Sequence, residues 1–223
     1  MEVNTLSDML PLLMRGTWIT IQITALAALL AMAMALLAAL AKLSPVRGLR
    51  WLANIYIEVF RGTSLLVQLF WLYFVLPLPP FNLSMTSFTV AVIGLGLHIG
   101  AYGAEVMRGA LTAVPRGQIE ASIALNIPPI RRFFRIVLPQ AMINVIPPGT
   151  NLLIELLKGT SLVSLITLAD LSFRANQLVQ LTFMSREIFG ITLLIYFVLA
   201  QCINFAMRML ARRLNRGALK RSR

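Results

Sequence analysis

The sequence contains a single cysteine, Cys202, and a single histidine, His98, among its 223 residues. An internal disulfide needs two cysteines, and a structural zinc site typically needs four His, Cys or acidic ligands held close together. A membrane-embedded protease or acyltransferase needs a nucleophile with a base, for which this sequence has little material. We therefore expect no catalytic residue, no metal site and no disulfide framework in this chain.

Charge is also scarce. Only 13% of the residues are charged, 58% are hydrophobic by type, and the mean hydropathy is +0.81. A soluble globule cannot bury that much apolar material, whereas a lipid bilayer accepts it as helices of about 20 mostly apolar residues. The sequence predicts an all-α integral membrane protein that forms one transmembrane domain, residues 1–223, without a sizeable soluble domain.

Acidic residues are few, eight against twenty Lys and Arg, so the net charge is +12. In a soluble protein this balance would suggest a nucleic-acid partner. In a membrane protein the basic excess marks the cytoplasmic loops, and we prefer that interpretation and expect no nucleic-acid partner. Residues 1–15 carry Glu2 and Asp8 against one base, Arg15, which is the wrong charge for a cleaved signal peptide. We therefore expect the first span to remain in the mature protein.

Five long apolar runs predict five transmembrane helices. They cover residues 18–41, 51–76, 88–114, 136–157 and 189–210. The second run stops at Pro77, where proline bars continuation of the helix, and Pro139 and Pro147-Pro148 are expected to bend the fourth. The apolar stretch 160–171 is too short to span, so we expect it to lie in the interface or to re-enter.

The basic residues are distributed unevenly between the predicted loops. Fourteen Lys and Arg lie on one side and four on the other, while Arg61 and Arg108 lie inside spans. Because cytoplasmic loops carry the excess of positive charge, this asymmetry places the N-terminus outside and the C-terminus in the cytoplasm. The polar segment 115–135 then becomes a cytoplasmic loop.

That cytoplasmic segment has the pattern of a short helix, a turn and a basic helix. Residues 118–125 are good helix formers, although so short a helix is marginal by itself. Asn126 stands where a helix end takes a left-handed residue, and Pro128-Pro129 prevents the helix from continuing. This shape suits docking into the groove of a partner, and a membrane-surface amphipathic segment is the alternative.

Several ordered motifs resemble the polar amino-acid branch of ATP-binding-cassette (ABC) importer permeases. Glu120-Ala121-Ser122, the turn at Asn126 and the IVLP sequence at 136–139 resemble the EAA loop of that family. Further similar motifs are RGTSLLVQLFWLYFVLP at 61–77, AYGAEVMRGAL at 101–111, LPQA at 138–141, PPGTN at 147–151 and LKGTSLVSLI at 157–166. The resemblance covers most of the chain.

Four positions depart from the family pattern. Ser122 replaces the second alanine of EAA, and Asn126 replaces the turn glycine, for which asparagine is the next best residue at positive φ. Ser64 stands where a proline is common, and Leu152 stands where an acidic residue often follows the Pro-Pro-x-x-Asn motif. Because that last region resembles the substrate path, Leu152 bears on substrate specificity.

The resemblance implies the permease subunit of a binding-protein-dependent importer in the bacterial cytoplasmic membrane. Its substrate would be a polar amino acid or a similar solute, with a compatible solute such as ectoine as an alternative. Its partners would be ATP-binding subunits, a second permease subunit, identical or paralogous, an extracytoplasmic solute-binding protein and membrane lipid. The chain has no Gly-x-x-x-x-Gly-Lys-Ser/Thr phosphate loop, so we expect it to bind no cofactor, with ATP and Mg²⁺ in the partner ATPase.

The resemblance also assigns candidate residues. Those expected to couple the permease to the ATPase are Gly117, Glu120, Ala121, Ser122 and Asn126. The candidates for the substrate path are His98, Asn151, Thr160 and Ser161. His98 is a candidate because of its position near the middle of a span, and for this residue we favour a role as a hydrogen-bonded packing histidine. An ion-coupled carrier or channel would use similar spans, but it would not need the helix at 118–125.

Charged residues inside the predicted spans are costly and are therefore functional candidates. They are Glu58, Arg61, Glu105 and Arg108. Each Glu–Arg pair is three residues apart and can meet on one helix face, and the rise per residue puts all four at one level. We expect one network, either a cytoplasmic gate or a structural clamp, and favour the clamp. The same spacing suggests an ion pair between Glu155 and Lys158.

Overall fold

The computed structural model describes the backbone of residues 6–221 and the side chains of residues 9–214, and over this range every regular element is helical. The α-helices are α1 (Leu6–Leu43), α2 (Arg47–Gly62), α3 (Leu65–Phe70), α4 (Ser87–Thr112), α5 (Arg116–Ala124), α6 (Pro129–Arg132), α7 (Leu138–Gly159), α8 (Leu171–Thr182) and α9 (Ser185–Arg221). A π-helical segment, Trp71–Val75, extends α3. A second π-helical segment, Phe133–Val137, precedes α7, and a 3₁₀ segment, Thr160–Ile166, follows it.

Three helices are long and apolar enough to cross a membrane, and two bent pairs raise the count to five. The three are α1 over Met9–Leu43, α4, and α9 over Ser185–Leu214. The pairs are α2 with Leu65–Val75, bent by 106°, and Pro129–Ile166 with α8, bent by 52°. The all-α membrane architecture predicted from the sequence is confirmed, and five spans correspond to the higher count.

The second predicted span is wrong as one continuous helix. The chain is extended at Thr63, with φ −119° and ψ 154°, and again at Ser64, so α2 and α3 are separate helices. A break in an apolar run leaves helix-end carbonyls without partners, which is tolerated only where other groups satisfy them. Here the side chain of Gln68 donates to the carbonyl oxygens of Phe60 and Thr63, at 3.0 and 3.3 Å.

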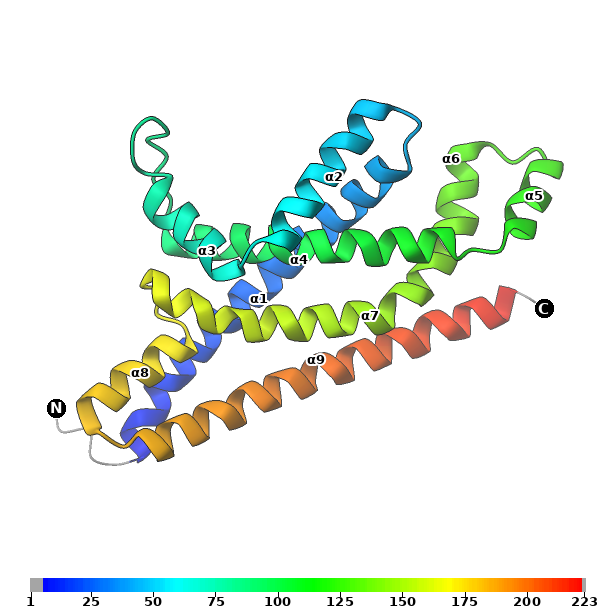
Figure 1. Cartoon of the computed structure of the whole chain (residues 1–223). Coiled ribbons are helices and arrows are strands. Elements are labelled where there is room, and N and C mark those ends of the chain that lie inside the picture. Colours follow the sequence, from blue (N-terminus) through cyan, green and yellow to red (C-terminus); the bar gives the residue numbers. More distant parts are fainter. Residues whose placement is uncertain (1–5, 222–223) are drawn as a thin grey trace.

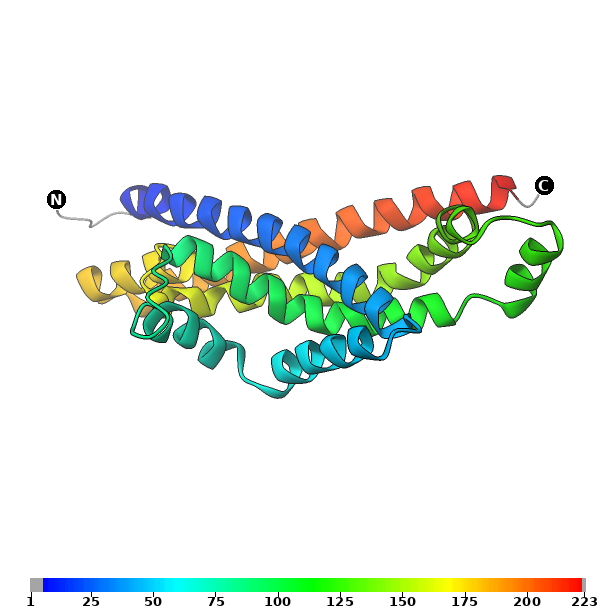
Figure 2. The same ribbon diagram turned by 90° about the horizontal axis from the view of Figure 1, so that it is seen from above.

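The packing of α4 against α1 forms the centre of the molecule. Both views show α1 crossing α4 (Figures 1 and 2). A Cβ on Gly96, Gly100 or Gly103 of α4 would lie within 2.7–2.9 Å of an α1 side chain. Small residues on one helix face allow two membrane helices to approach closely. The main core cluster then extends from this contact to Leu69 of α3 and Leu156 of α7.

Helix α8 was not predicted from the sequence. It begins at Asp170, whose carboxylate accepts hydrogen bonds from the backbone N–H groups of Ser172 and Phe173. It ends at Phe183, which has φ +58°. The preceding 3₁₀ segment ends at Thr167, at φ +61°, so the stretch expected to re-enter or to lie in the interface forms a short 3₁₀ helix and a turn before α8.

The ends of the molecule carry different loops (Figures 1 and 2). The α1–α2 connection, α5 with α6, and the C-terminal part of α9 lie at one end, which we call the basic end. The N-terminus, the loop at 76–86 and α8 lie at the opposite end. All three segments predicted to be cytoplasmic therefore share one end, although Arg223 lies outside the described residues. Helix α7 continues through Pro147 and Pro148, and the chain changes direction before it, between α6 and α7.

Candidate functional site

The segment expected to dock on a partner forms a helix, a turn and a helix, as predicted. Helix α5 covers Arg116–Ala124, and Asn126 follows with φ +56°. The backbone N–H of Ile127 donates to the carbonyl oxygen of Ser122 at 3.0 Å, which closes the turn. Helix α6 then begins at Pro129, a position where proline is favoured because its missing N–H would have no partner.

This segment presents apolar side chains to its surroundings. Ile123, Leu125 and Ile130 are 56%, 74% and 76% exposed, whereas Ser122 is buried and its hydroxyl donates to the carbonyl oxygen of Ile119 at 2.6 Å. Helix α5 projects beyond the long helices at the basic end (Figure 2). Clustered exposed apolar residues on a projecting loop indicate a contact surface for another protein or for lipid. The remaining predicted coupling residues, Gly117, Glu120 and Ala121, are exposed on the same short helix.

A cavity of about 370 Å³ lies between α3, α4, α7 and the 3₁₀ segment. Its lining residues are Leu65, Leu95, His98, Ile99, Glu155, Leu156, Lys158, Gly159, Ser161 and Leu162. The wall is close-packed at Gly159, where a Cβ would lie 3.1 Å from Leu95 and 3.2 Å from Leu65. A mostly apolar cavity with a few polar groups is the usual form of a small-molecule site.

Two opposite charges line this cavity without neutralising each other. Glu155 and Lys158 lie one helical turn apart on α7, yet neither forms an ion pair within the part of the chain that the structure describes. The predicted Glu155–Lys158 pair is therefore wrong for this structure. The hydroxyl of Ser161 donates to the carbonyl oxygen of Lys158 at 2.8 Å, so it is already committed to the backbone. The residues that line the cavity thus include one acid and one base, and both are exposed.

His98 is both buried in the packed interior and part of the cavity wall. The residue is 8% exposed, and its Nδ1 lies 3.1 Å from Oε1 of Gln68, so its ring has a partner within the packed interior. The ring also packs against Tyr102, with 5.3 Å between the centroids. At the same time His98 is part of the cavity wall. A packing role and a place in the cavity are thus compatible.

The structure brings together only part of the predicted substrate path. His98 and Ser161 line the cavity, but Asn151 is exposed on α7 outside it. Thr160 is fully buried, and its hydroxyl donates to the carbonyl oxygen of Leu157. Glu155 and Lys158 take the place in the cavity expected for Asn151 and Thr160. Their spacing was visible in the sequence, but spacing does not distinguish a pair from two groups that face a common space.

The predicted four-residue charge network does not form within the described chain. Glu105 instead binds two cations, the ammonium group of Lys42 and Nε of Arg108, the latter at 2.9 Å. Arg61 lies over the ring of Tyr102, 5.2 Å from its centroid, and Glu58 is exposed without an ion pair among these residues. The C-terminal turn of α1 brings Lys42 to α4, whereas aromatic residues lie where α2 meets α4. We call Lys42, Glu105 and Arg108 the charge triad.

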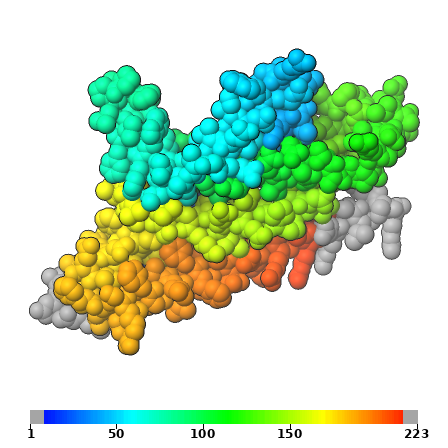
Figure 3. Space-filling view, in the orientation of Figure 1, coloured from blue at the N-terminus to red at the C-terminus, as the bar shows by residue number. Residues whose placement is uncertain are grey.

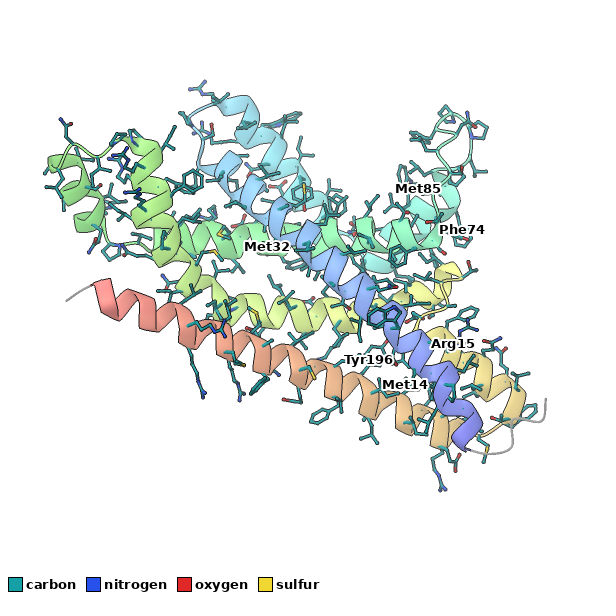
Figure 4. The ribbon with its side chains drawn as sticks, turned by 180° about the vertical axis from the view of Figure 1, so that it is seen from behind. Met14, Arg15, Met32, Phe74, Met85 and Tyr196 are labelled. Atoms are coloured by element: carbon teal, nitrogen blue, oxygen red, sulfur yellow. The ribbon has the colours of Figure 1, made fainter. Side chains whose placement is uncertain are left out.

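A second polar cluster lies near the opposite end of the molecule. The Tyr196 hydroxyl of α9 lies 2.9 Å from that of Ser172, and the Thr20 hydroxyl accepts from the backbone N–H of Leu171 at 3.2 Å. Tyr196 lies between α9 and α1 in Figure 4. The approach is close, because a Cβ on Gly16 would lie 2.7 Å from the carbonyl oxygen of Asp170. This cluster joins α1, α8 and α9, and sequence reasoning missed it because its members are far apart in the chain.

Comparison with known families gives a match over most of the chain. Residues 31–216 match the family described as binding-protein-dependent transport system inner membrane component. A probable amino-acid ABC transporter permease of Sinorhizobium fredii is 42% identical over 207 residues, which cover 91% of this chain and 87% of the relative. The L-cystine transport system permease TcyB of Bacillus subtilis is 36% identical over 94% of this chain and 89% of the relative. The arginine transport system permease ArtQ of the same organism is 35% identical over 92% of this chain and 93% of the relative.

Solved structures agree with this match. The crystal structure of an amino acid ABC transporter with histidines contains a chain that is 34% identical, with a TM-score of 0.84 over 96% of this chain and 100% of that one. An inward-facing methionine ABC transporter has a TM-score of 0.79 with 20% identity, over 94% and 99% of the two chains. At that identity the second likeness concerns the fold alone.

Proposed function

The chain belongs to the family of binding-protein-dependent transport system inner membrane components, and we propose that it forms the path of a polar amino acid across the bacterial inner membrane. Membership makes it a multi-pass permease subunit of an ABC importer, a class that is not itself catalytic. The proposal adds its partners: ATP-binding subunits that carry ATP and Mg²⁺, a second permease subunit and an extracytoplasmic solute-binding protein. The relatives are named for amino acids, cystine and arginine, and these names give no support to ectoine.

The unpaired Glu155 and Lys158 in the cavity carry this proposal. An amino acid is a zwitterion whose carboxylate and ammonium groups are attached to one carbon. Lys158 complements the first group and Glu155 the second, and the volume of about 370 Å³ is within the usual range for small-molecule sites. Leu152, where the family pattern has an acidic residue, packs against the core cluster, and Glu155 lies one turn further along α7.

Lys158→Met and Glu155→Gln should each raise the KM for amino-acid uptake. A lost charge-assisted hydrogen bond corresponds to roughly a 10- to 100-fold change in affinity. The measurement is uptake of labelled L-arginine, L-glutamine and L-cystine by cells that produce the complete importer. Asn144→Ala is the matched control, because Asn144 is polar, lies on the same helix and is exposed outside the cavity. Unchanged KM values in both charge variants would mean that the solute binds elsewhere.

The proposed orientation places the basic end in the cytoplasm, with the N-terminus outside. In a chain whose own cysteine has been changed by Cys202→Ser, Leu83→Cys in the exposed loop at the opposite end should react with a membrane-impermeant maleimide on intact spheroplasts. Gly117→Cys on α5 should react only after permeabilisation, because α5 faces the cytoplasm in this orientation. Labelling of Gly117→Cys from outside would invert the topology and contradict docking of α5 on a cytoplasmic ATPase.

Helix α5 supports the proposed coupling. Its predicted coupling residues are exposed, and the neighbouring Ile123 and Leu125 offer apolar area to a partner at the basic end. Docking of this surface on an ATP-binding subunit would transmit nucleotide-driven movement to α4 and α6, the helices that flank the loop. The corresponding experiment concerns Ala121 and opens the Discussion.

A further inference from the structure

The side chain of Gln68 is held in one orientation at the break between α2 and α3. Its amide nitrogen Nε2 donates to the carbonyl oxygens of Phe60 and Thr63, at 3.0 and 3.3 Å, and to the Thr63 hydroxyl at 2.7 Å. Turning the amide over would place its oxygen against two carbonyl oxygens, neither of which can donate, and against the Thr63 hydroxyl, which already donates to the carbonyl oxygen of Val59. The amide oxygen Oε1 of Gln68 must therefore face the other way, toward His98.

This orientation determines which nitrogen of His98 carries the proton. Oε1 of Gln68 can only accept, and it lies 3.1 Å from Nδ1 of His98, so Nδ1 is the donor. A neutral imidazole has one donor and one acceptor, and the hydrogen bond of one nitrogen sets the role of the other. The ring is 8% exposed, and the cost of burying an imidazolium outweighs the attraction of Glu155 in the same cavity wall, so the neutral form is favoured. Nε2 is then unprotonated.

The ring that carries this nitrogen is part of the wall of the cavity. His98 lines it together with Glu155 and Lys158, and no hydrogen bond to Nε2 is found among the side chains described. A neutral acceptor in the wall of a binding site discriminates between ligands, because a ligand that lacks the matching donor leaves that nitrogen desolvated and unpaired.

We propose that His98 is a specificity-determining residue, whose unprotonated Nε2 selects solutes that place an N–H or O–H donor against it, and that Gln68 is the positioning residue that holds this tautomer. The selection rests on the proposed function, because it assumes that the cavity binds the transported solute. The assignment of the tautomer does not depend on that assumption. The preferred solutes are amino acids with a donor in the side chain, such as glutamine and arginine.

The tautomer can be observed directly, because this chain has one histidine. The complete importer is labelled with ¹⁵N-ring histidine, and subtraction of the NMR spectrum of a His98→Gln importer leaves the signals of His98 alone. We expect one protonated and one unprotonated nitrogen, with the proton on Nδ1. Gln68→Met, which removes the acceptor, should produce a mixture of tautomers. A proton on Nε2 in the wild type, or an unchanged tautomer in Gln68→Met, would overturn the assignment.

The uptake test uses two variants that each keep one half of the imidazole. Asparagine reproduces the Nδ1 donor and loses the acceptor in the cavity, whereas glutamine reaches the position of Nε2 and loses the contact with Gln68. Loss of a hydrogen bond lowers affinity roughly tenfold, so His98→Asn should raise the KM for L-glutamine and L-arginine by about that factor, and His98→Gln by less. L-Methionine lacks a side-chain donor, so the concentration of L-methionine that inhibits uptake should change little in either variant.

A purely packing role predicts the opposite order. His98→Asn keeps the bond to Gln68 and would then be the milder variant, with an effect on protein yield and not on KM. That ranking, or equal changes for L-methionine and L-glutamine, would overturn the selection. Failure of the proposed function gives a different result: Lys158→Met and Glu155→Gln would keep a normal KM, while the NMR measurement would still decide the tautomer.

Discussion

Ala121→Arg should abolish solute uptake while the permease still inserts into the membrane. Ala121 is exposed on α5, next to the buried Ser122 and the 56% exposed Ile123. A long cationic side chain on this short helix prevents close approach of a partner and places an uncompensated charge in the contact. Such a defect costs several kcal/mol, so we expect uptake to fall by more than about 100-fold.

The measurements are uptake, co-purification of the ATP-binding subunit, and the amount of permease in the membrane fraction. Gly48→Arg is the matched control, because Gly48 lies at the same end in the first turn of α2 and a side chain there meets nothing within 4 Å. Normal uptake together with normal co-purification in Ala121→Arg would remove α5 as the coupling surface. Loss of the permease from the membrane in both variants would instead show that added charge at this end blocks insertion.

Glu105→Leu should reduce the stability of the permease more than a change of either partner cation. Glu105 holds Lys42 of α1 and Arg108 of α4, and the side chains are 21%, 24% and 40% exposed. Removal of the carboxylate leaves two cations facing each other. Exposed ion pairs contribute less than about 1 kcal/mol to stability, and breaking a buried ion pair costs about 3–5 kcal/mol. For this partly buried site we therefore expect the free energy of unfolding to fall by about 2 kcal/mol.

The single changes Lys42→Met and Arg108→Met should each be milder, because the remaining cation still neutralises Glu105. Their combination isolates the carboxylate, and its effect should exceed the sum of the two single effects, which a double-mutant cycle on thermal stability measures. In the predicted network of Glu58, Arg61, Glu105 and Arg108, by contrast, loss of Arg108 alone would leave two carboxylates with one cation. Strictly additive losses would mean that the two cations act independently of each other and do not share Glu105 as a common partner.

The sequence by itself determined the class of protein and the position of the loop that contains α5 and α6. Apolar run lengths predicted a helical membrane protein, and Asn126 followed by Pro128-Pro129 predicted the turn after α5. These signals are local: run length, residue type and conformational restriction act over a few positions, so they can be read along the chain. The ordered motifs between 61 and 166 pointed to the family that the comparison then showed.

The tertiary structure decided which polar groups meet. It brought Lys42 to Glu105, which is 63 positions away in the sequence. It placed the break between α2 and α3 where Gln68 satisfies the free carbonyls, and Figure 3 shows the surface hollowed above that break. It also brought Glu155 and Lys158 into the wall of one cavity. Helical spacing fixes which residues share a face, but it does not say which other helix that face meets. That choice depends on the close packing of α1 on the glycine face of α4, which only the folded chain reveals.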